Sequence, residues 1–562
     1  MIALWSLLVA PALAQDPAPV DAGLGILITQ DGLANVNTLA TSLPLDNFLI
    51  DDTSVRECYG LLCWSCLEEY AFAISNMWVD LGLNSVDIDT STGVIDLTAH
   101  LSVAINDASD KFTLYYELLC AGTTCPTYVD PFLASVNMPL SMAVVEQDGV
   151  PFVDVTVDSI DVSYDLASED IHMDCSLGGF EDFLNLLGLS VYDWILSLIE
   201  PELQAAIADI APELETALEE AIASATVDTT VDALGTELTI RLLPSDIQIG
   251  PPGVEVWLDS EITAEPAQCI DGLDAGDFRR TSSQFVGADG LPAGIHAGLT
   301  ITDDMVNQVL YAAWRGGLLC LDIDSELAGG FAIDTTLLDL LVPGAFEGLF
   351  DADEPGELII ATSPQAPPLA DFSGDAAIGI DIDRFGLDLI ADLDDRAARV
   401  LGAELEAPVT LPLDFDGTTG ELAAEIVMDS DRVEVWVMTS EISPVSTEDL
   451  SAELTDTLGG LMETVVGSAV PPIAFTLPAF EGLGAQEIIA DSLGDDQETL
   501  GILVQAGPVT YESMGCDDLT SEDGGCGGCE DSGDCGGCSS ASGQSRVMWL
   551  LLMPLLVGLR RQ

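Results

Sequence analysis

Thirteen cysteines and three histidines are the residues of this sequence with the widest chemical repertoire. Eight of the cysteines precede the C-terminal segment, and an even set in a protein outside the cytosol favours disulfide bonds. The Cys-x-x-Cys and Cys-x4-Cys spacings in the first half leave a four-thiolate zinc site as the alternative. The disulfide candidates are Cys58, Cys63, Cys66, Cys120, Cys125, Cys175, Cys269 and Cys320.

The rest of the sequence offers little catalytic chemistry. It contains no HExxH, GxSxG or phosphate-binding-loop motif. His100 falls on the polar phase of a strand pattern, and His172 has acidic neighbours but no nearby nucleophile. We therefore expect no enzymatic activity, no catalytic residue and no cofactor.

Paired aspartates recur along the second half, as at Asp322/Asp324, Asp381/Asp383 and Asp414/Asp416. Such pairs could bind calcium, but a strand places residues i and i+2 on the same face by default. A solvated acidic sheet face therefore explains them, and we predict no metal site.

Composition excludes some partners. The 562 residues carry a net charge of −84, and Lys111 is the single lysine. Nucleic acid needs a basic surface, so it is excluded, and unassisted docking on anionic lipid headgroups is disfavoured. A saline habitat, where salt screens the repulsion, and a calcium-binding surface remain as explanations. The apolar content of 48% is ample for large cores.

Both ends of the sequence indicate export. Residues 1–14 (MIALWSLLVAPALA) are apolar and end in Ala-Leu-Ala, which is typical of a secretory signal peptide. Residues 511–546 form a Gly/Cys/Asp-rich, low-complexity segment, and residues 547–562 add an apolar run and two terminal arginines. The apolar run is too short for a permanent membrane helix.

The C-terminal tail resembles the MYXO-CTERM sorting signals. The resemblance implies processing at Cys538 by a sorting protease of the myxosortase type, with transient membrane association through the tail. It also implies display on the cell surface or outer membrane, or release, in a Gram-negative-type bacterium.

A strand, a helix and a second strand are predicted within residues 298–323. Leu299 and Ile301 alternate with polar residues, and Thr302 is placed to cap a helix. Apolar residues then recur on one helical face until a Gly-Gly pair ends the helix, and alternation resumes at Leu319, Leu321 and Ile323. A weaker version of the same order occurs at residues 25–40.

The pattern predicts a duplicated domain. Alternating strands occupy residues 95–105 and 153–164, and a 3.6-residue period indicates long helices over about residues 180–227 and 447–467. Each half thus contains a short helix, strands, a longer helix and final strands. We place the first unit at 24–263, a linker at 264–292 and the second unit at 293–510.

Several stretches together resemble the family of bactericidal/permeability-increasing and lipopolysaccharide-binding proteins. They are residues 25–33, the Tyr192-Asp-Trp194 segment with its following helix, residues 298–319, residues 367–372 and residues 447–478. The resemblance covers about residues 24–508. The sequence differs from the family members that bind lipopolysaccharide through a basic tip, because Arg56 and Lys111 are the basic residues, apart from histidine, within residues 1–240.

The resemblance implies an α+β fold of two tandem tubular lipid-binding (TULIP) barrels. Each would be a highly twisted antiparallel sheet wrapped around a long helix, and the two would join in an elongated boomerang. The implied function is binding or transfer of phospholipid or another acyl lipid in apolar tunnels. An acidic structural or adhesive surface protein without lipid is the alternative. The candidate tunnel-wall residues are Leu187, Trp194, Leu198, Met305, Val309, Leu310 and Trp314.

Overall fold

The structure is a computed structural model that describes most of the chain between residues 19 and 509. The described residues are 19–34, 48–50, 53–58, 69–118, 121–147, 149–167, 170–174, 201, 204, 211–212, 215–216, 218–219, 222–223, 226–233, 236–270, 273, 291–323, 333–346, 350, 355–373, 377–392, 396–424, 427–440, 442–455, 457, 473–476, 483–494 and 497–509. Within them the fold is dominated by antiparallel sheets with few helices, which confirms the sheet-rich α+β prediction.

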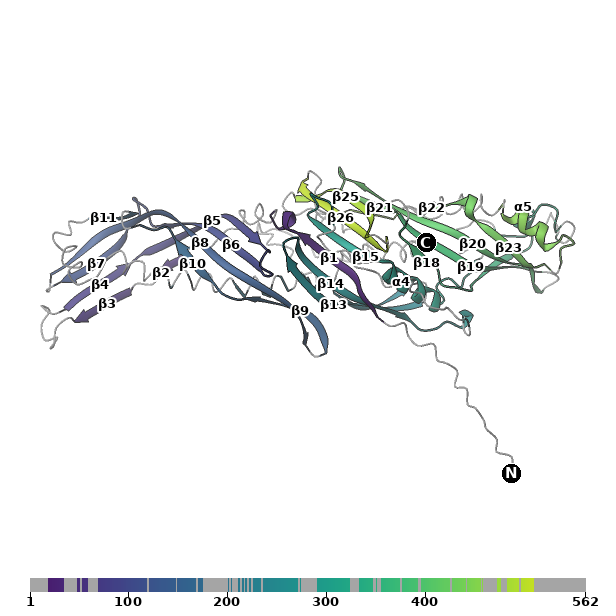
Figure 1. Ribbon diagram of the computed structural model, residues 1–562, viewed down its shortest axis with the longest axis horizontal. Coiled ribbons are helices and arrows are strands. Elements are labelled where there is room, and N and C mark those ends of the chain that lie inside the picture. The colour runs from purple at the N-terminus through teal and green to yellow at the C-terminus, as the bar shows by residue number, and fades with distance from the viewer. Residues whose placement is uncertain are drawn as a thin grey trace, which may run out of the picture.

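Three sheets follow one another along an elongated body (Figure 1). A first-half sheet lies at one end, a sheet built from both halves lies in the middle, and a second-half sheet lies at the other end. The apolar core is nearly continuous from the middle sheet into the second half, while the far end of the first half has a separate cluster.

The first-half sheet is centred on one very long strand, β8 (Ala121–Gln147). Alternation in the sequence produces alternation in burial: along β6, Leu101, Val103 and Ile105 are buried between partly exposed neighbours. The other strands are β2 (Phe48–Ile50), β3 (Thr53–Cys58), β4 (Glu69–Ser75), β5 (Met77–Asp89), β6 (Ile95–Ile105), β7 (Phe112–Leu118), β9 (Val150–Val157), β10 (Asp161–Tyr164) and β11 (Ile171–Met173).

The middle sheet joins the halves through the pairing of β1 (Val20–Thr29) with β15 (Ala297–Thr302). Leu24 lies opposite Ile301, and Ile28 lies opposite Ala297. The order of the sheet is β12 (Val227–Ala233), β13 (Thr236–Gly250), β14 (Gly253–Ala264), β1, β15, β26 (Thr499–Pro508) and β25 (Leu483–Leu493). In each half the first strand therefore pairs with the last described strand of the same half.

The second-half sheet is built on β19 (Ala377–Asp392) and β20 (Ala397–Asp416). The strands that flank them are β16 (Asp322–Ile323), β17 (Leu358–Pro364), β18 (Leu369–Asp371), β21 (Glu421–Ala424), β22 (Val427–Met428), β23 (Glu434–Thr439) and β24 (Ile473–Thr476). Both β22 and β23 pair with β20. A short helix, α5 (Thr336–Leu341), lies at the outer end of this half (Figure 1).

Helix α4 (Asp303–Arg315) forms where the sequence predicts it. The Thr302 hydroxyl accepts a hydrogen bond from the Met305 amide, which caps the first turn, and Gly316 ends the helix. Every residue of α4 except Tyr311 is buried, because the helix packs against β1, β13, β14, β15 and β18 together.

The segment after α4 differs from the prediction. We expected the strand pattern to resume at Leu319, but a turn comes first and the described strand residues are Asp322–Ile323. Gly317 has a φ of +77°, a conformation that L-residues rarely adopt. A Cβ there would also lie 2.5 Å from Ala267 Cβ, so the turn is packed closely against the chain that follows β14.

Candidate functional site

An apolar slot lies inside the second half, between the sheet and two helices. Its volume is about 70 Å³, and every residue that lines it is aliphatic. The lining residues are Leu337, Leu341, Ile360, Leu387, Leu389, Leu401, Ala403 and Leu454.

Strand register builds the floor of the slot. Ile360 on β17 lies opposite Leu389 on β19, and Leu389 lies opposite Leu401 on β20, so one row crosses three strands. In the next row Leu387 lies opposite Ala403. The floor is therefore a continuous hydrocarbon surface, and the small Ala403 side chain leaves room above it.

Two amphipathic helices form the roof. Leu337 and Leu341 are i and i+4 on α5, so they point to the same side of that helix. The other helix, called the covering helix below, comprises the described helical residues 447–455 and 457. Its Leu450 and Leu454 are 0% and 1% exposed and face the core, and Leu454 reaches the slot.

The covering helix begins at a clear cap. The Ser446 hydroxyl accepts a hydrogen bond of 3.2 Å from the Asp449 amide, and it donates one of 2.6 Å to the Asp449 carboxylate. This reciprocal pairing satisfies a backbone donor that the first turn leaves without a partner. The helix thus starts at a fixed residue and presents its leucine face to the slot.

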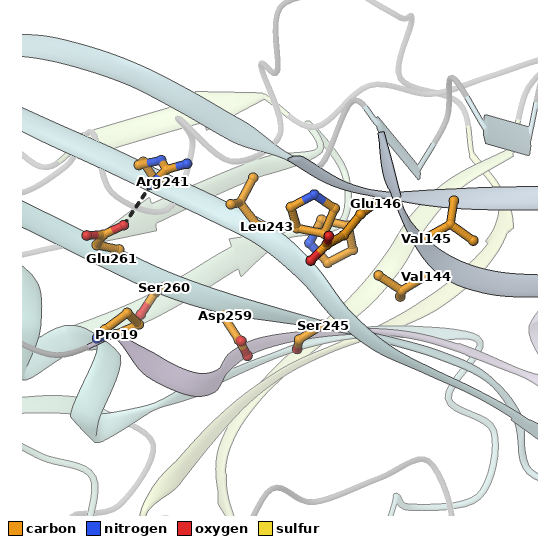
Figure 2. A pocket seen from close by; sticks show the side chains of 12 residues that line it. Pro19, Val144, Val145, Glu146, Arg241, Leu243, Ser245, Asp259, Ser260 and Glu261 are labelled. Carbon is orange, nitrogen blue, oxygen red and sulfur yellow. Dashed lines mark hydrogen bonds and ion pairs between the residues drawn. The ribbon is translucent and has the colours of Figure 1, made fainter. Parts of the chain in front are cut away.

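A second hollow of about 470 Å³ lies at the junction of the first-half and middle sheets (Figure 2). The β8–β9 turn region contributes Glu146, and β13 and β14 contribute Arg241, Asp259 and Glu261. The Arg241 guanidinium is 2.9 Å from Glu261 and 3.4 Å from Asp228, so carboxylates already surround the one cation of this cleft. The cleft is therefore acidic and does not suit an anionic headgroup.

The structure brings four of the predicted tunnel-wall residues together on α4. Met305, Val309, Leu310 and Trp314 are all buried in the large core. The Trp314 Nε1 donates to the Pro364 carbonyl over 3.0 Å. Neither hollow described above touches these residues, and α4 packs against five strands. Their role at a lipid stays a prediction.

Other predicted residues fall outside the described part of the chain. They include the wall candidates Leu187, Trp194 and Leu198, the processing site Cys538, the signal segment 1–14 and the segments 511–546 and 547–562. The cysteines Cys63, Cys66, Cys120 and Cys175 are likewise not described, and Cys58 is placed only as the end of β3.

The disulfide prediction is confirmed for Cys269 and Cys320, whose sulfurs are bonded. This bond ties the 3-10 turn Gln268–Ile270, in the predicted linker, to the turn after α4. Cys125 is also disulfide-bonded. A cysteine in a disulfide is not a thiolate, so the alternative zinc site that used Cys125 is wrong.

Sequence reasoning missed the slot residues themselves. The alternation at Leu387 and Leu389 predicted a strand, but it did not distinguish a floor residue from any other inward residue. The α5 pair Leu337 and Leu341 carried a detectable i, i+4 signal. Only the register of distant strands shows that these residues share one hollow.

Acidic residues gather on the outer face of the same sheet. Burial raises the pKa of Glu406, and a hydrogen bond and repulsion from Asp383 add to this effect, followed by repulsion from Glu434 and Glu404. Across the described residues, no group of three metal-ligating side chains is positioned to hold an ion. Within the same residues, no helix combines the length and apolarity that crossing a membrane requires.

The fold and the slot define a sheet-rich α+β protein with a hydrocarbon-lined interior site. No protein-family model matches the chain, and no curated protein matches its sequence. Among solved structures, the chain is similar to lipopolysaccharide binding protein, with 12% identity and a TM-score of 0.45, over 88% of this chain and 100% of that one.

The chain is also similar to the P47 proteins of two Clostridium botulinum strains. The E1 protein is 10% identical with a TM-score of 0.21, over 87% of this chain and 99% of that one. The A2 protein is 9% identical with a TM-score of 0.23, with the same two coverages.

Proposed function

We propose that this protein binds the hydrocarbon chain of a lipid in the apolar slot of its second half. The observation that carries the proposal is the all-aliphatic lining, supplied by three neighbouring strands and two helices. A site without any polar side chain cannot orient a polar substrate by hydrogen bonds, but it offers a dry surface to methylene groups.

The size of the slot limits what it accepts. Its volume of about 70 Å³ fits the end of an acyl chain rather than a ring system or a whole lipid. Each methylene group transferred from water contributes about 0.8 kcal/mol, so a few buried groups give measurable affinity. A longer chain would have to displace Leu454 or its neighbours on the covering helix.

Charge points to the class of headgroup. The protein carries a net charge of −84, and the junction cleft holds Arg241 already paired with carboxylates. Like charges repel, so an anionic headgroup would pay an electrostatic cost that a neutral or zwitterionic one avoids. The proposed ligand is therefore a neutral or zwitterionic acyl lipid, such as a zwitterionic phospholipid.

The proposal extends to the whole protein as a non-catalytic lipid carrier. It would have two tubular barrels, be exported, and be displayed at the cell surface or outer membrane of a Gram-negative-type bacterium, or released. The sequence features of residues 1–14 and 511–562 support export, and the resemblance of residues 24–508 supports the barrels. Cell fractionation with and without the tail tests the location.

Lipid binding is tested by filling the slot. Ala403→Leu places an isobutyl group in the hollow, and Ala397→Leu makes the same change at an exposed position of the same strand. We expect purified protein to release lipid on organic extraction and to take up a fluorescent fatty-acyl probe. Ala403→Leu should weaken probe binding at least about tenfold, the equivalent of about 1.4 kcal/mol, and Ala397→Leu should not change it.

The second candidate is an acidic structural or adhesive surface protein whose core holds no lipid. The dense acidic face around Glu406 favours it. Protein that yields no extractable lipid and takes up no acyl probe would support this candidate and refute lipid binding.

A further inference from the structure

The covering helix lies along the edge of β23 at which none of the described strands pairs. β23 pairs with β20 through one edge, and the amides of Val435 and Val437 point away from that partner. These two amides donate to side-chain hydroxyls on the helix. The Val437 amide is 2.8 Å from Ser451 Oγ, and the Val435 amide is 3.2 Å from Thr455 Oγ1. We call these two contacts the hydroxyl seam.

The hydroxyl seam borders the slot directly. Val437 lies opposite Ala403, which forms part of the slot floor. Leu454, which forms part of the roof, sits on the helix between the two seam residues Ser451 and Thr455. Movement of the helix away from β23 would therefore lift Leu454 and expose the floor at Ala403.

The first half contains the same arrangement. The Val157 amide is 2.7 Å from Glu215 Oε1, and the Val155 amide is 3.1 Å from Glu219 Oε1. In both halves two helix residues four positions apart accept hydrogen bonds from two strand amides two positions apart. The helix and the strand run in opposite directions, so the later strand residue contacts the earlier helix residue. Among the described strands, β9 pairs with β8 alone and β23 pairs with β20 alone. The repeated seam is a feature of the fold rather than an accident of one site.

The seam closes one side of the slot without backbone pairing between the helix and the strand. Backbone ladders join β17 to β19, β19 to β20 and β20 to β23, with a register shift at Leu389/Ile390 in the β19–β20 pair and another at Gly402/Ala403 in the β20–β23 pair. The covering helix is held to its neighbouring strand by side-chain hydrogen bonds and by its leucine face. Because hydrophobic contacts with the helix are replaced by contacts with an incoming acyl chain, opening there costs less than breaking a ladder.

We propose that the covering helix is a lateral lid, and that acyl chains reach the slot by transient opening of the hydroxyl seam. This inference rests on the proposed function, since it assigns the route to the same slot. A lid of this kind sets the rate of lipid exchange more than the affinity.

The test loosens the seam without touching the slot. The double variant Ser451→Ala, Thr455→Val removes both acceptor oxygens and keeps the helix face of Leu450 and Leu454. The control is Thr457→Val, because the Thr457 hydroxyl bonds within the helix to the Glu453 carbonyl at 2.8 Å. Two measurements are made on the full chain: hydrogen exchange at the Val435 and Val437 amides, and stopped-flow binding and release of a fluorescent fatty-acyl probe.

We expect the double variant to speed exchange at both amides and to raise probe association and release rates about tenfold each, because two hydrogen bonds no longer hold the lid. The probe Kd should stay within about twofold, since both rates rise together. Thr457→Val should behave as the unmodified protein does.

The outcomes separate the two claims. Probe binding with unchanged rates in the double variant, despite faster amide exchange, would overturn the lid and leave lipid binding intact. Unchanged amide exchange would show that the seam does not hold the helix and would also overturn the lid. A complete lack of probe binding by every variant would overturn both.

Discussion

The Ser260 hydroxyl donates a hydrogen bond of 2.9 Å to Gln308 Oε1, and both residues are fully buried. Ser260 belongs to β14 of the first half, and Gln308 belongs to α4 at the start of the second half. A Cβ added at Gly23 of β1 would lie 2.8 Å from the same hydroxyl, so three elements meet at this point. This buried polar contact links the two halves beside the β1–β15 ladder that also joins them.

Removal of this contact should destabilise the protein. We expect Ser260→Ala to lower the free energy of unfolding by about 1–2 kcal/mol, because the change leaves a buried amide oxygen with fewer donors. The control is Ser245→Ala on the neighbouring strand β13, where the residue is exposed and the change should cost less than about 0.5 kcal/mol. Chemical denaturation measures both, and equal effects of the two substitutions would contradict the role given to Ser260.

The Cys269–Cys320 disulfide should contribute strongly to stability. Its two cysteines are 51 residues apart. A cross-link that closes a loop of this length lowers the entropy of the unfolded chain and so raises the free energy of unfolding by about 3–4 kcal/mol. The double variant Cys269→Ser, Cys320→Ser should therefore show a lowered thermal midpoint under non-reducing conditions. A midpoint equal to that of the unmodified protein would contradict a stabilising role for this bond.

The first-half contacts of Glu215 with the Val157 amide and of Glu219 with the Val155 amide should depend on oxygen acceptors rather than on charge alone. Glu215→Ala with Glu219→Ala should cost about 2–3 kcal/mol, because two edge amides of β9 lose their acceptors. The matched double change to Gln keeps a carbonyl oxygen at each position and should cost less than half as much. Amide exchange at Val155 and Val157 checks the local effect, and equal exchange in the two variants would refute the assignment.

Glu406 should make stability depend on pH in a defined direction. Its pKa lies above the ordinary value of 4.5, so the folded state holds the proton more tightly than the unfolded state does. The contribution of Glu406 to stability therefore falls as pH rises from 4.5 through the raised pKa, and it is unfavourable at neutral pH. Glu406→Gln should stabilise the protein at neutral pH by about 0.5 kcal/mol, after allowance for solvent screening.

The measurement for Glu406 is the difference in unfolding free energy between variant and unmodified protein across this pH window. Glu421→Gln, at an exposed position on β21, serves as the control. A difference that does not grow with rising pH, or a variant less stable at neutral pH, would contradict the prediction.

Salt should stabilise the protein. A net charge of −84 creates strong self-repulsion, and the screening length falls from about 10 Å at 0.1 M salt to about 3 Å at 1 M. We expect the thermal midpoint to rise by at least about 5 °C over this range of sodium chloride. Calcium chloride at matched ionic strength separates screening from binding, since a further rise specific to calcium would show a cation site. A midpoint that falls or stays constant with sodium chloride would be inconsistent with repulsion.

Local features of the sequence were predictable because they depend on neighbouring residues. The capping Thr302, the helix that follows it and the glycine that ends it are set by interactions within one turn. The alternation of residues 95–105 fixed β6, because a strand with one buried face needs a period of two. The duplicated order of elements stays a prediction, since much of the first-half helical segment lies outside the described residues.

The composition of the candidate site was not predictable. Residues of α4 had the strongest apolar face in sequence, yet α4 is enclosed by five strands and neither described hollow touches Met305 or Trp314. The slot is instead lined by Leu401 and Ala403 of β20. The register between β19 and β20 places Leu389 opposite Leu401 and Leu387 opposite Ala403. Register is a long-range property, and a slip of one residue would turn every one of these side chains to the other face.

The sequence by itself determined local elements of this protein: antiparallel strands, the capped helix 303–315 and the acidic character. Only the tertiary structure decided where a hollow remains and what closes it. The edge amides of Val435 and Val437 meet Ser451 and Thr455 because a helix and a strand from different segments are packed side by side. Periodicity states which face of an element is apolar, but the partner of that face depends on the packing of the whole chain.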